Sequence, residues 1–380
     1  MLGAIFDPNE GHLDPAGATH AYAKAARHGG AQIYRNTRVI ELRQLPDGAW
    51  LVVTDQGRLK AEHIVNAAGL WAREVGKMVG VDLPLLPMEH QYLVTEDLSE
   101  LRRLDREIAL TVDLDGEIYV RQEGKGVLLG IYEKEATPWA VHGTPWDFGT
   151  DLLPANLDRI SSELERGFER FPALQSAGIR RVVNGPFTFT PDGNPLVGPL
   201  PGLRNCWVAC GVMAGFAQGG GIGLALSNWI ASGEPESDIF AMDVARFGSF
   251  ATRAYVRERV REFYARRFQL AYPNEYWPAG RPAKTSALHD LALEANGVHG
   301  VSFGLEIPLF FARAGTPAEE TTTLRRSNAF DCVSHECRTA RATVGIADGS
   351  SYAKYEVTGQ GAAKWLDVMR RNCYAVGGAR

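Results

Sequence analysis

Two segments of the sequence place very small residues at the end of an apolar run, where a ligand can reach the main chain. In residues 65–71 (VNAAGLW), Ala67, Ala68 and Gly69 follow an apolar strand pattern. Small side chains let a phosphate or a flavin chain approach the backbone at the carboxyl end of a strand, where α/β sheets bind ligands. Close packing of a helix on a strand needs the same residues, so this segment alone leaves both interpretations open.

The second segment, residues 215–223 (GFAQGGGIG), predicts a helix that begins among glycines. Glycine inside a helix costs stability, which favours an approaching ligand over packing alone. The start of a helix offers unpaired N–H groups and the positive end of the dipole, which would stabilise negative charge on a reduced flavin. In residues 37–39 (TRV), Val39 at a strand end can contact an adenine edge, although most such valines belong to the core.

Four polar side chains in an expected sheet are candidates for substrate chemistry. His90 and Tyr92 alternate along one strand, so they share a face, as do Tyr119 and Arg121 on another. Arg121 can hold a carboxylate through two parallel hydrogen bonds. We select His90, Tyr92 and Arg121 as catalytic candidates. The competing interpretations are a core histidine with satisfied hydrogen bonds, an exposed sheet face and a surface arginine.

Other polar groups favour structural roles. Asp14 is explained by capping a helix, and His12 beside it is a weak catalytic candidate. The spacing of Cys332, His335 and Cys337 fits no usual zinc pattern and lacks a fourth ligand, so no metal site is predicted. Cys206 and Cys210 lie in an apolar strand and are expected in the core.

The order of expected elements is that of an α/β domain with an insertion. A helix is predicted over residues 12–30, strands over 33–45, 49–56 and 63–69, and a helix over 71–80. Residues 82–190 change to short β-like runs, which predict an inserted antiparallel sheet, with a helix near 155–171 and a strand near 179–183. The turn at 190–199 (TPDGNPLVGP) then leads to a strand over 205–212 and the glycine-rich helix. Residues 244–285 read as a helix-rich connector, and an α+β segment with a hairpin-like stretch at 350–367 follows.

Composition excludes several classes of protein. The 380 residues are enough for two or three domains, and 45% hydrophobic and 22% charged residues are ordinary for a globular chain. A net charge of -5 argues against a nucleic-acid surface or a basic membrane anchor. The five cysteines show no disulfide framework spacing, which fits a reducing compartment, and no apolar run suits a membrane span. Because no targeting segment is visible, we expect a cytoplasmic protein, or a mitochondrial matrix protein in a eukaryote.

Several motifs in this order resemble one family. Residues 11–15 (GHLDP), 37–39 (TRV), 66–76 (NAAGLWAREVG), 87–96 (PMEHQYLVTE), 190–199 (TPDGNPLVGP) and 219–223 (GGGIG) are similar to the sarcosine/dimethylglycine dehydrogenases. The connector ending in YPNEYWPAGRPAKTSALHD resembles that family's middle segment. The run RRSNAFDCVSHECRTARATVGIADGSSYAKYEVTGQGAAKWLD resembles the opening of its folate-binding, aminomethyltransferase-like domain. The resemblance covers essentially the whole chain.

The resemblance implies a partial Rossmann-like FAD-binding domain over 1–243 with the substrate sheet at 82–190. A connector at 244–285 and the first part of an aminomethyltransferase-like domain at 286–380 follow. The family's strand–GxGxxG–helix unit is expected to lie upstream of this sequence. Residues 304–311 (GLEIPLFF) depart from the family's usual GWERPxWF, which leaves the subfamily open. The cofactor contacts implied are Val39, Ala67, Ala68, Gly69, Trp71, Gly215, Ala217, Gln218, Gly219, Gly220 and Gly221.

The implied activity is oxidation of an N-methyl group of sarcosine or dimethylglycine by hydride transfer to FAD. The one-carbon unit then passes to tetrahydrofolate or leaves as formaldehyde, and the electron acceptor stays unassigned. Two other functions remain open at this point. One is a non-catalytic fragment or binding module without flavin, and the other is a different FAD-dependent amine or amino-acid oxidase.

Overall fold

The computed structural model describes residues 3–375. These residues divide into two compact units, Met1–Lys284 with Thr322–Leu324, and Thr285–Thr321 with Arg325–Arg380. Within the described part of the chain, no helix is long and apolar enough to cross a membrane.

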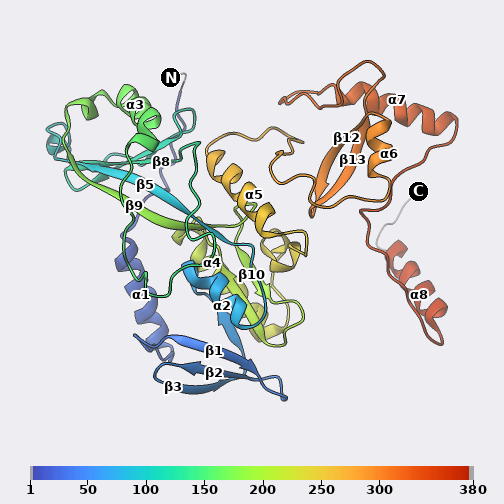
Figure 1. Ribbon diagram of the computed structural model, residues 1–380, viewed down its shortest axis with the longest axis horizontal. Helices are drawn as coiled ribbons and strands as arrows, with labels where there is room; N and C mark the ends of the chain where they lie inside the picture. The colour runs from blue at the N-terminus through green and yellow to red at the C-terminus, as the bar shows by residue number, and fades with distance from the viewer. Residues whose placement is uncertain (1–2, 376–380) are drawn as a thin grey trace. The chain divides into compact units, whose positions relative to one another are not determined.

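The first unit opens with a helix and a small antiparallel sheet (Figure 1). Helix α1 spans Pro15–His28. The Asp14 carboxylate accepts hydrogen bonds from two amides of its first turn, and Gly29 caps its end, as predicted. The sheet has the order β1-β2-β3, with β1 at Val39–Gln44, β2 at Trp50–Thr54 and β3 at Gly57–Ala61. Strand β3 was not predicted because its sequence, GRLKA, has only one large apolar residue.

A second sheet brings together segments that lie far apart in the sequence. Its order is β10-β11-β4, with β4 at Ile64–Asn66, β10 at Leu196–Pro199 and β11 at Cys206–Cys210. Strand β4 runs into the 3-10 turn η1 (Gly69–Trp71) and helix α2 (Ala72–Met78), and β11 leads to α4 (Phe216–Ser232). Cys206 and Cys210 are buried in its core, as predicted.

The inserted region forms the predicted antiparallel sheet, in the order β6-β7-β8-β5-β9. Its strands are β5 (Leu86–Thr95), β6 (Thr111–Asp113), β7 (Ile118–Glu123), β8 (Gly126–Ile131) and β9 (Ile179–Phe189). Strand β9 is longer than the expected 179–183 because it pairs with β5 along the whole of that strand, from Leu86 opposite Phe189. Helix α3 (Ser161–Arg170) covers one face, where Leu93, Leu129 and Leu164 share a core.

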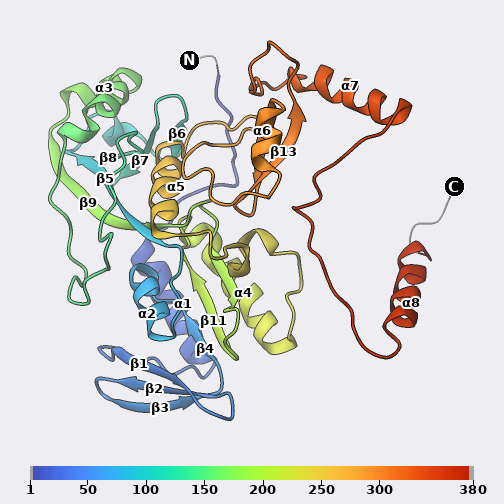
Figure 2. The same ribbon diagram turned by 45° about the vertical axis from the view of Figure 1, so that its right-hand side comes forward.

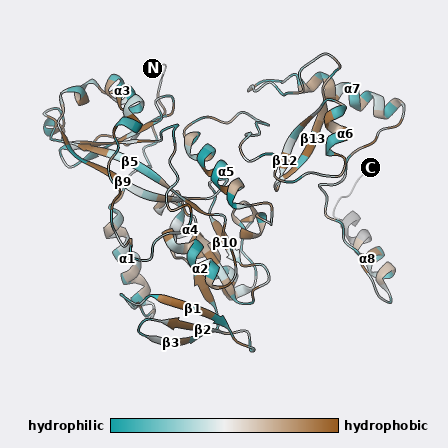
Figure 3. Cartoon of the chain, in the orientation of Figure 1, coloured by the Kyte–Doolittle hydropathy of each residue, from teal (hydrophilic) through white to brown (hydrophobic). Residues whose placement is uncertain are grey.

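Helix α5 (Arg253–Ala265) covers the opposite face of β5 and β9 (Figure 2). It alternates hydrophilic and hydrophobic residues (Figure 3), and its buried Val256, Val260 and Tyr264 pack with Met88 and Phe189. The connector was expected to be rich in helix, but α5 is its one α-helix.

Short 3-10 turns make up the remaining helical structure of this unit. They are η2 (Leu101–Arg103), η3 (Asp158–Ile160), η4 (Pro172–Ser176), η5 (Phe240–Met242) and η6 (Val244–Arg246).

The second unit is built around one antiparallel pair of strands. Helix α6 (His289–Glu294) precedes β12 (Gly297–Ser302) and β13 (Leu305–Phe311), and α7 (Ala329–Ala342) and α8 (Ala362–Ala375) follow. The predicted hairpin at 350–367 was wrong, because residues 350–358 form no strand and 362–367 are helical. Tyr352 and Tyr355, the two tyrosines of this stretch, are largely exposed.

A buried arginine fixes the turn that joins the substrate sheet to β10. Arg246 Nε and Nη2 donate to the two carboxylate oxygens of Asp192 at 2.7 and 2.8 Å. Its Nη groups also donate to the carbonyls of Asn194 and Pro195 at 2.7 and 2.9 Å. The guanidinium therefore holds both ends of the Asp192–Pro195 turn through charge-assisted bonds.

Replacing this arginine should destabilise the first unit strongly. Arg246→Ala removes five hydrogen bonds from a side chain that is only 5% exposed, among them the guanidinium bond to the carbonyl of buried Pro195. We expect the free energy of unfolding to fall by about 3 kcal/mol, measured by urea denaturation. Arg257→Ala, on the exposed surface of α5, is the matched control and should change it by about 0.5 kcal/mol or less. Equal effects of the two changes would contradict this role of Arg246.

Candidate functional site

The parallel pairing of β4 with β11 brings two of the predicted ligand-binding segments to one sheet edge. Val208 pairs with Asn66 and Cys206 with Ile64, so the two strands end side by side. The turn at 67–71 leaves one strand there, and the segment leading to α4 leaves the other. The carboxyl edge of a parallel pair is where α/β sheets bind ligands.

The turn after β4 is held by Asn66, a residue that sequence reasoning did not select. Asn66 Nδ2 donates to the Ala72 carbonyl at 2.8 Å, and its Oδ1 accepts from the Ala68 amide at 3.2 Å. These bonds close the turn from inside, so Ala67 and Gly69 are left exposed. Gly69 has φ +53° and no neighbouring atom where a Cβ would stand. The sequence signal for Asn66, its position directly before three small residues, was not used to select it.

The start of α4 is open on its glycine side. Gly215, with φ +56°, caps the helix, and no atom lies within 4 Å of a Cβ added at Gly215, Gly219 or Gly221. Ala217 is exposed, and Gln218 Oε1 is buried without a hydrogen-bond partner among residues 3–375. The space and the unused polar atom fit an extended, polar cofactor better than helix packing. Gly220 differs, because the Tyr22 hydroxyl of α1 lies 2.9 Å from its Cβ position.

A loop from the substrate region is fastened onto the turn after β4. Trp71 Nε1 donates to the Pro145 carbonyl at 2.9 Å, and Thr144 Oγ1 donates to the Leu70 carbonyl at 3.0 Å. Arg73 Nη2 donates to the Ala140 carbonyl at 3.0 Å. The β4–β11 edge and the inserted region are thus tied together within the first unit.

Two of the predicted contacts are placed less directly. Val39 is half-buried at the first residue of β1, in a different sheet from the edge just described. The indole nitrogen of Trp71 is already bonded to Pro145, so only its ring is left to contact a cofactor. Their cofactor contacts stay predictions.

His90 lies where the ladder of the substrate sheet is interrupted. Strand β8 pairs with β5 only opposite Tyr92–Val94, and the chain returns to β5 where Pro138 lies opposite Met88. His90 Nδ1 is 2.9 Å from the Tyr264 hydroxyl and its Nε2 is 3.1 Å from the Tyr119 hydroxyl.

The surroundings of His90 are aromatic. Its ring centroid is 4.7 Å from that of Tyr132 and 5.5 Å from that of Phe187. Burial, together with the smaller effect of the positive charge of Arg159, lowers the pKa of His90 to about 4. His90 is therefore neutral near pH 7, with both ring nitrogens bonded to phenols.

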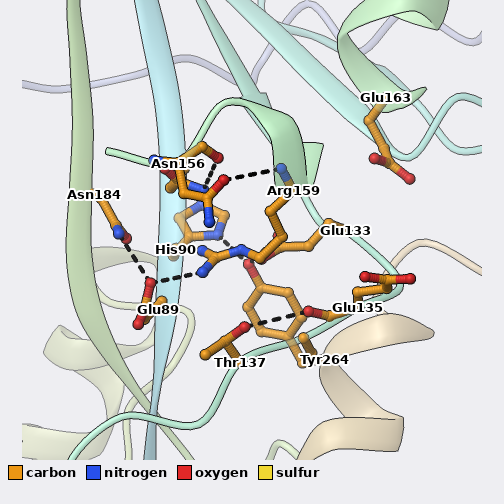
Figure 4. A network of polar contacts seen from close by, with 12 residues as sticks. Glu89, His90, Glu133, Glu135, Thr137, Asn156, Arg159, Glu163, Asn184 and Tyr264 are labelled. Carbon is orange, nitrogen blue, oxygen red and sulfur yellow. Dashed lines mark hydrogen bonds and ion pairs between the residues drawn. The ribbon is translucent and has the colours of Figure 1, made fainter. Parts of the chain in front are cut away.

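A buried ion-pair cluster adjoins this histidine (Figure 4). Arg159 Nη1 donates to Glu89 Oε2 at 2.7 Å, and its Nε lies 3.2 Å from Glu133 Oε1. Asn184 Nδ2 donates to Glu89 Oε2 at 3.0 Å. Tyr264 donates to Glu133 Oε2 at 2.8 Å, which joins the cluster to His90.

The other two catalytic candidates are less engaged with His90. Tyr92 is half-buried two residues further along β5. Arg121 Nη1 forms an ion pair with Glu123 at 2.6 Å, so this pair must open before Arg121 can bind a substrate carboxylate. The structure instead assigns direct contacts with His90 to Tyr119 and Tyr264. Sequence reasoning placed Tyr119 on one face with Arg121 without selecting it, and gave Tyr264, in the expected connector, no role.

The burial of neutral His90 predicts a specific loss of stability in acid. Its folded-state pKa of about 4 lies below the ordinary 6.5, so its contribution is complete above pH 6.5 and disappears as pH falls through 4. Between these limits, the free energy of unfolding should fall by about 3 kcal/mol on account of this group. His90→Gln should flatten that part of the pH profile in urea titrations. The matched change His20→Gln, on the exposed face of α1, should not, and an unaltered profile in His90→Gln would contradict the assignment.

Comparisons with known proteins agree with this arrangement. Residues 1–229 match the profile of the family described as FAD dependent oxidoreductase, residues 232–286 match the FAD dependent oxidoreductase central domain, and residues 288–379 match the GCVT N-terminal domain. A solved structure of L-proline dehydrogenase from P. horikoshii has the same fold, with a TM-score of 0.53 and 24% identity. That likeness covers 61% of this chain and 59% of that one. The expected fold class is therefore confirmed.

Two curated relatives span almost the whole of this chain. Mitochondrial dimethylglycine dehydrogenase of Mus musculus is 40% identical over 378 residues, which is 98% of this chain and 43% of the relative. Mitochondrial sarcosine dehydrogenase of Homo sapiens is 31% identical over 408 residues, or 97% of this chain and 44% of the relative. The chain thus spans less than half the length of these relatives, and the expected family resemblance is confirmed. The chain belongs to the FAD dependent oxidoreductases, among the relatives of dimethylglycine and sarcosine dehydrogenase.

Proposed function

We propose that these residues serve the FAD-dependent oxidation of an N-methyl amine that carries a carboxylate, with dimethylglycine or sarcosine as substrate. Passage of the one-carbon unit to tetrahydrofolate belongs to the same proposal, because residues 288–379 match the GCVT N-terminal domain. The relatives are more than twice as long, so the complete reaction is proposed for the assembly of parts that they contain. We keep the division into 1–243, 244–285 and 286–380 as part of this proposal; the matched ranges end at residues 229, 286 and 379.

The observation that carries the proposal is the pairing of Val208 with Asn66, which sets two ligand-accessible turns at one edge. The loop held by Trp71 and Thr144 joins that edge to the substrate sheet. Bound FAD would supply the acceptor for a hydride from the methyl C–H bond. Ala67, Gly69, Gly215, Gly219 and Gly221 would hold it, and the start of α4 would favour negative charge on its reduced form.

The protein groups supply a route for the proton of the amine. A protonated amine has no lone pair to share with the carbon that loses hydride, so it must be deprotonated first. His90 is neutral and bonded through Nε2 to the Tyr119 hydroxyl. Burial raises the pKa of Tyr119, so the phenol stays protonated and passes a proton on to His90 while receiving one from the amine.

The cofactor assignment can be tested with the chain itself. The purified 380-residue protein, mixed with FAD, should retain a bound flavin absorption after gel filtration. Gly219→Leu should lose it, because the side chain would fill the open space at the start of α4. Leu224→Ala, at an exposed position of the same helix, is the matched control and should keep it.

The stability of Gly219→Leu in urea shows whether its loss of flavin comes from a blocked site or from misfolding. Leucine in place of glycine inside a helix raises helix propensity by roughly 0.5–1 kcal/mol, so Gly219→Leu should unfold at the same or a higher urea concentration without flavin. A colourless native protein would support the fragment or binding-module alternative. If neither dimethylglycine nor sarcosine bleaches the bound flavin, the result would favour the alternative function as a different FAD-dependent amine or amino-acid oxidase.

The role of Tyr119 is tested by the rate of flavin reduction. Tyr119→Phe removes the hydroxyl that connects the amine with His90 and should slow anaerobic reduction by roughly 10²-fold at pH 7. The deficit should shrink at high pH, where the amine is already neutral. Tyr276→Phe, at an exposed phenol, should leave the rate unchanged. A deficit in Tyr119→Phe that is independent of pH would contradict a proton-transfer role.

A further inference from the structure

The hydrogen bonds around His90 have a defined direction. A phenol carries one hydrogen, and an ionised carboxylate only accepts. Since Tyr264 donates to Glu133 Oε2 at 2.8 Å, its oxygen must accept from His90 Nδ1 at 2.9 Å. Neutral imidazole carries one hydrogen, so Nδ1 bears it and Nε2 accepts from the Tyr119 hydroxyl at 3.1 Å.

We propose that Glu133 takes up the amine proton, which reaches it from Tyr119 through this directed chain of hydrogen bonds. The proposal rests on the amine oxidation proposed above. The residues of this chain of hydrogen bonds, in order from the amine, are Tyr119, His90, Tyr264 and Glu133. Tyr264 is a positioning residue, because it acts through His90 and Glu133.

Each bond change along the chain is balanced. An N–H bond of the ammonium breaks, and an O–H bond forms on Tyr119 as its own hydrogen moves to His90 Nε2. The hydrogen on Nδ1 moves to Tyr264, whose hydrogen moves to Glu133 Oε2. The substrate becomes a neutral amine and Glu133 a neutral acid, with no change in oxidation state.

The charges around Glu133 favour it as the acceptor. Two carboxylates, Glu89 and Glu133, share the single cation Arg159, whose well-aligned bond goes to Glu89 at 2.7 Å. Glu133 Oε1 lies 3.2 Å from Arg159 Nε but receives no hydrogen bond from the described residues. Arg159 Nη2 likewise donates no hydrogen bond to the described residues. A buried excess of negative charge is costly, so a proton on Glu133 relieves the cluster.

Burial supports the same direction. Glu133 is 1% exposed, and desolvation raises its pKa while Tyr264 and Arg159 oppose the rise. The remaining charge that faces it is Glu163 on α3, which raises the pKa further. Tyr132 precedes Glu133 in the sequence, and its phenol interacts with the positive charge of Arg267.

The tautomer of His90 provides a test that needs neither flavin nor substrate. In the full chain labelled with ¹⁵N-histidine, the His90 signal, identified by its loss in His90→Gln, should show hydrogen on Nδ1 at pH 7. Tyr264→Phe removes the acceptor and should shift the hydrogen to Nε2. Hydrogen on Nε2 in the unaltered protein would overturn the proposal.

The protonation of Glu133 is tested by infrared difference spectra between acid and alkaline pH. A buried carboxylic C=O band should persist above the pH at which ordinary glutamates ionise, and Glu133→Gln should abolish it. Glu169→Gln, an exposed carboxylate on α3, should retain it. A band unaffected by Glu133→Gln would refute the assignment. If both spectroscopic results hold and neither amine bleaches bound flavin, the proposed function fails and the directed chain stands.

Discussion

The short parallel contact between β4 and β11 is the constraint on which the candidate site depends. Parallel strands cannot be joined by a tight turn, so the chain must travel a long way between them. Here that path contains the whole substrate sheet and α3. The three residue pairs between β4 and β11 therefore position the turn at 67–71 beside the segment that leads to α4. They also fix the two ends of the inserted chain that forms the five-stranded sheet. Asn66, the last residue of β4, also closes the turn that follows it.

The part of the fold that the sequence predicted is the part governed by local patterns. Asp14 and Gly29 bound α1 because caps satisfy backbone groups within one turn, and alternation identified β5 and β7 as strands. The hairpin expected over residues 350–367 was wrong, since a strand is stabilised by packing of one face and Tyr352 and Tyr355 are largely exposed. The length of β9 could not be predicted, since it is set by its partner β5 and not by its own residues.

For the candidate site, the sequence indicated the two turns that meet at the sheet edge, but not most of the residues that surround His90. Small residues at the ends of strands are a signal that the sequence itself carries. In contrast, Tyr264 and Glu133 meet His90 only because α5 packs across the sheet and β8 departs from β5. Residues on separate elements acquire a common function through tertiary packing, so neither spacing nor composition indicated them. Arg159 was hidden in the same way, in a 3-10 turn between the sheet and α3.

Helix α5 is anchored to the substrate sheet at close range. Phe263 lies against Gly193, where a Cβ atom would stand 1.9 Å from its ring, and Tyr264 reaches His90 from the next position. A gene cut at the end of the first matched range, residue 229, would therefore remove the partner of a buried histidine along with Arg246. Shuffling of this oxidoreductase among fusion partners has to keep the connector helix with it. A fusion that keeps this oxidoreductase unit intact must therefore be joined after α5, although the first matched range ends before α5, at residue 229.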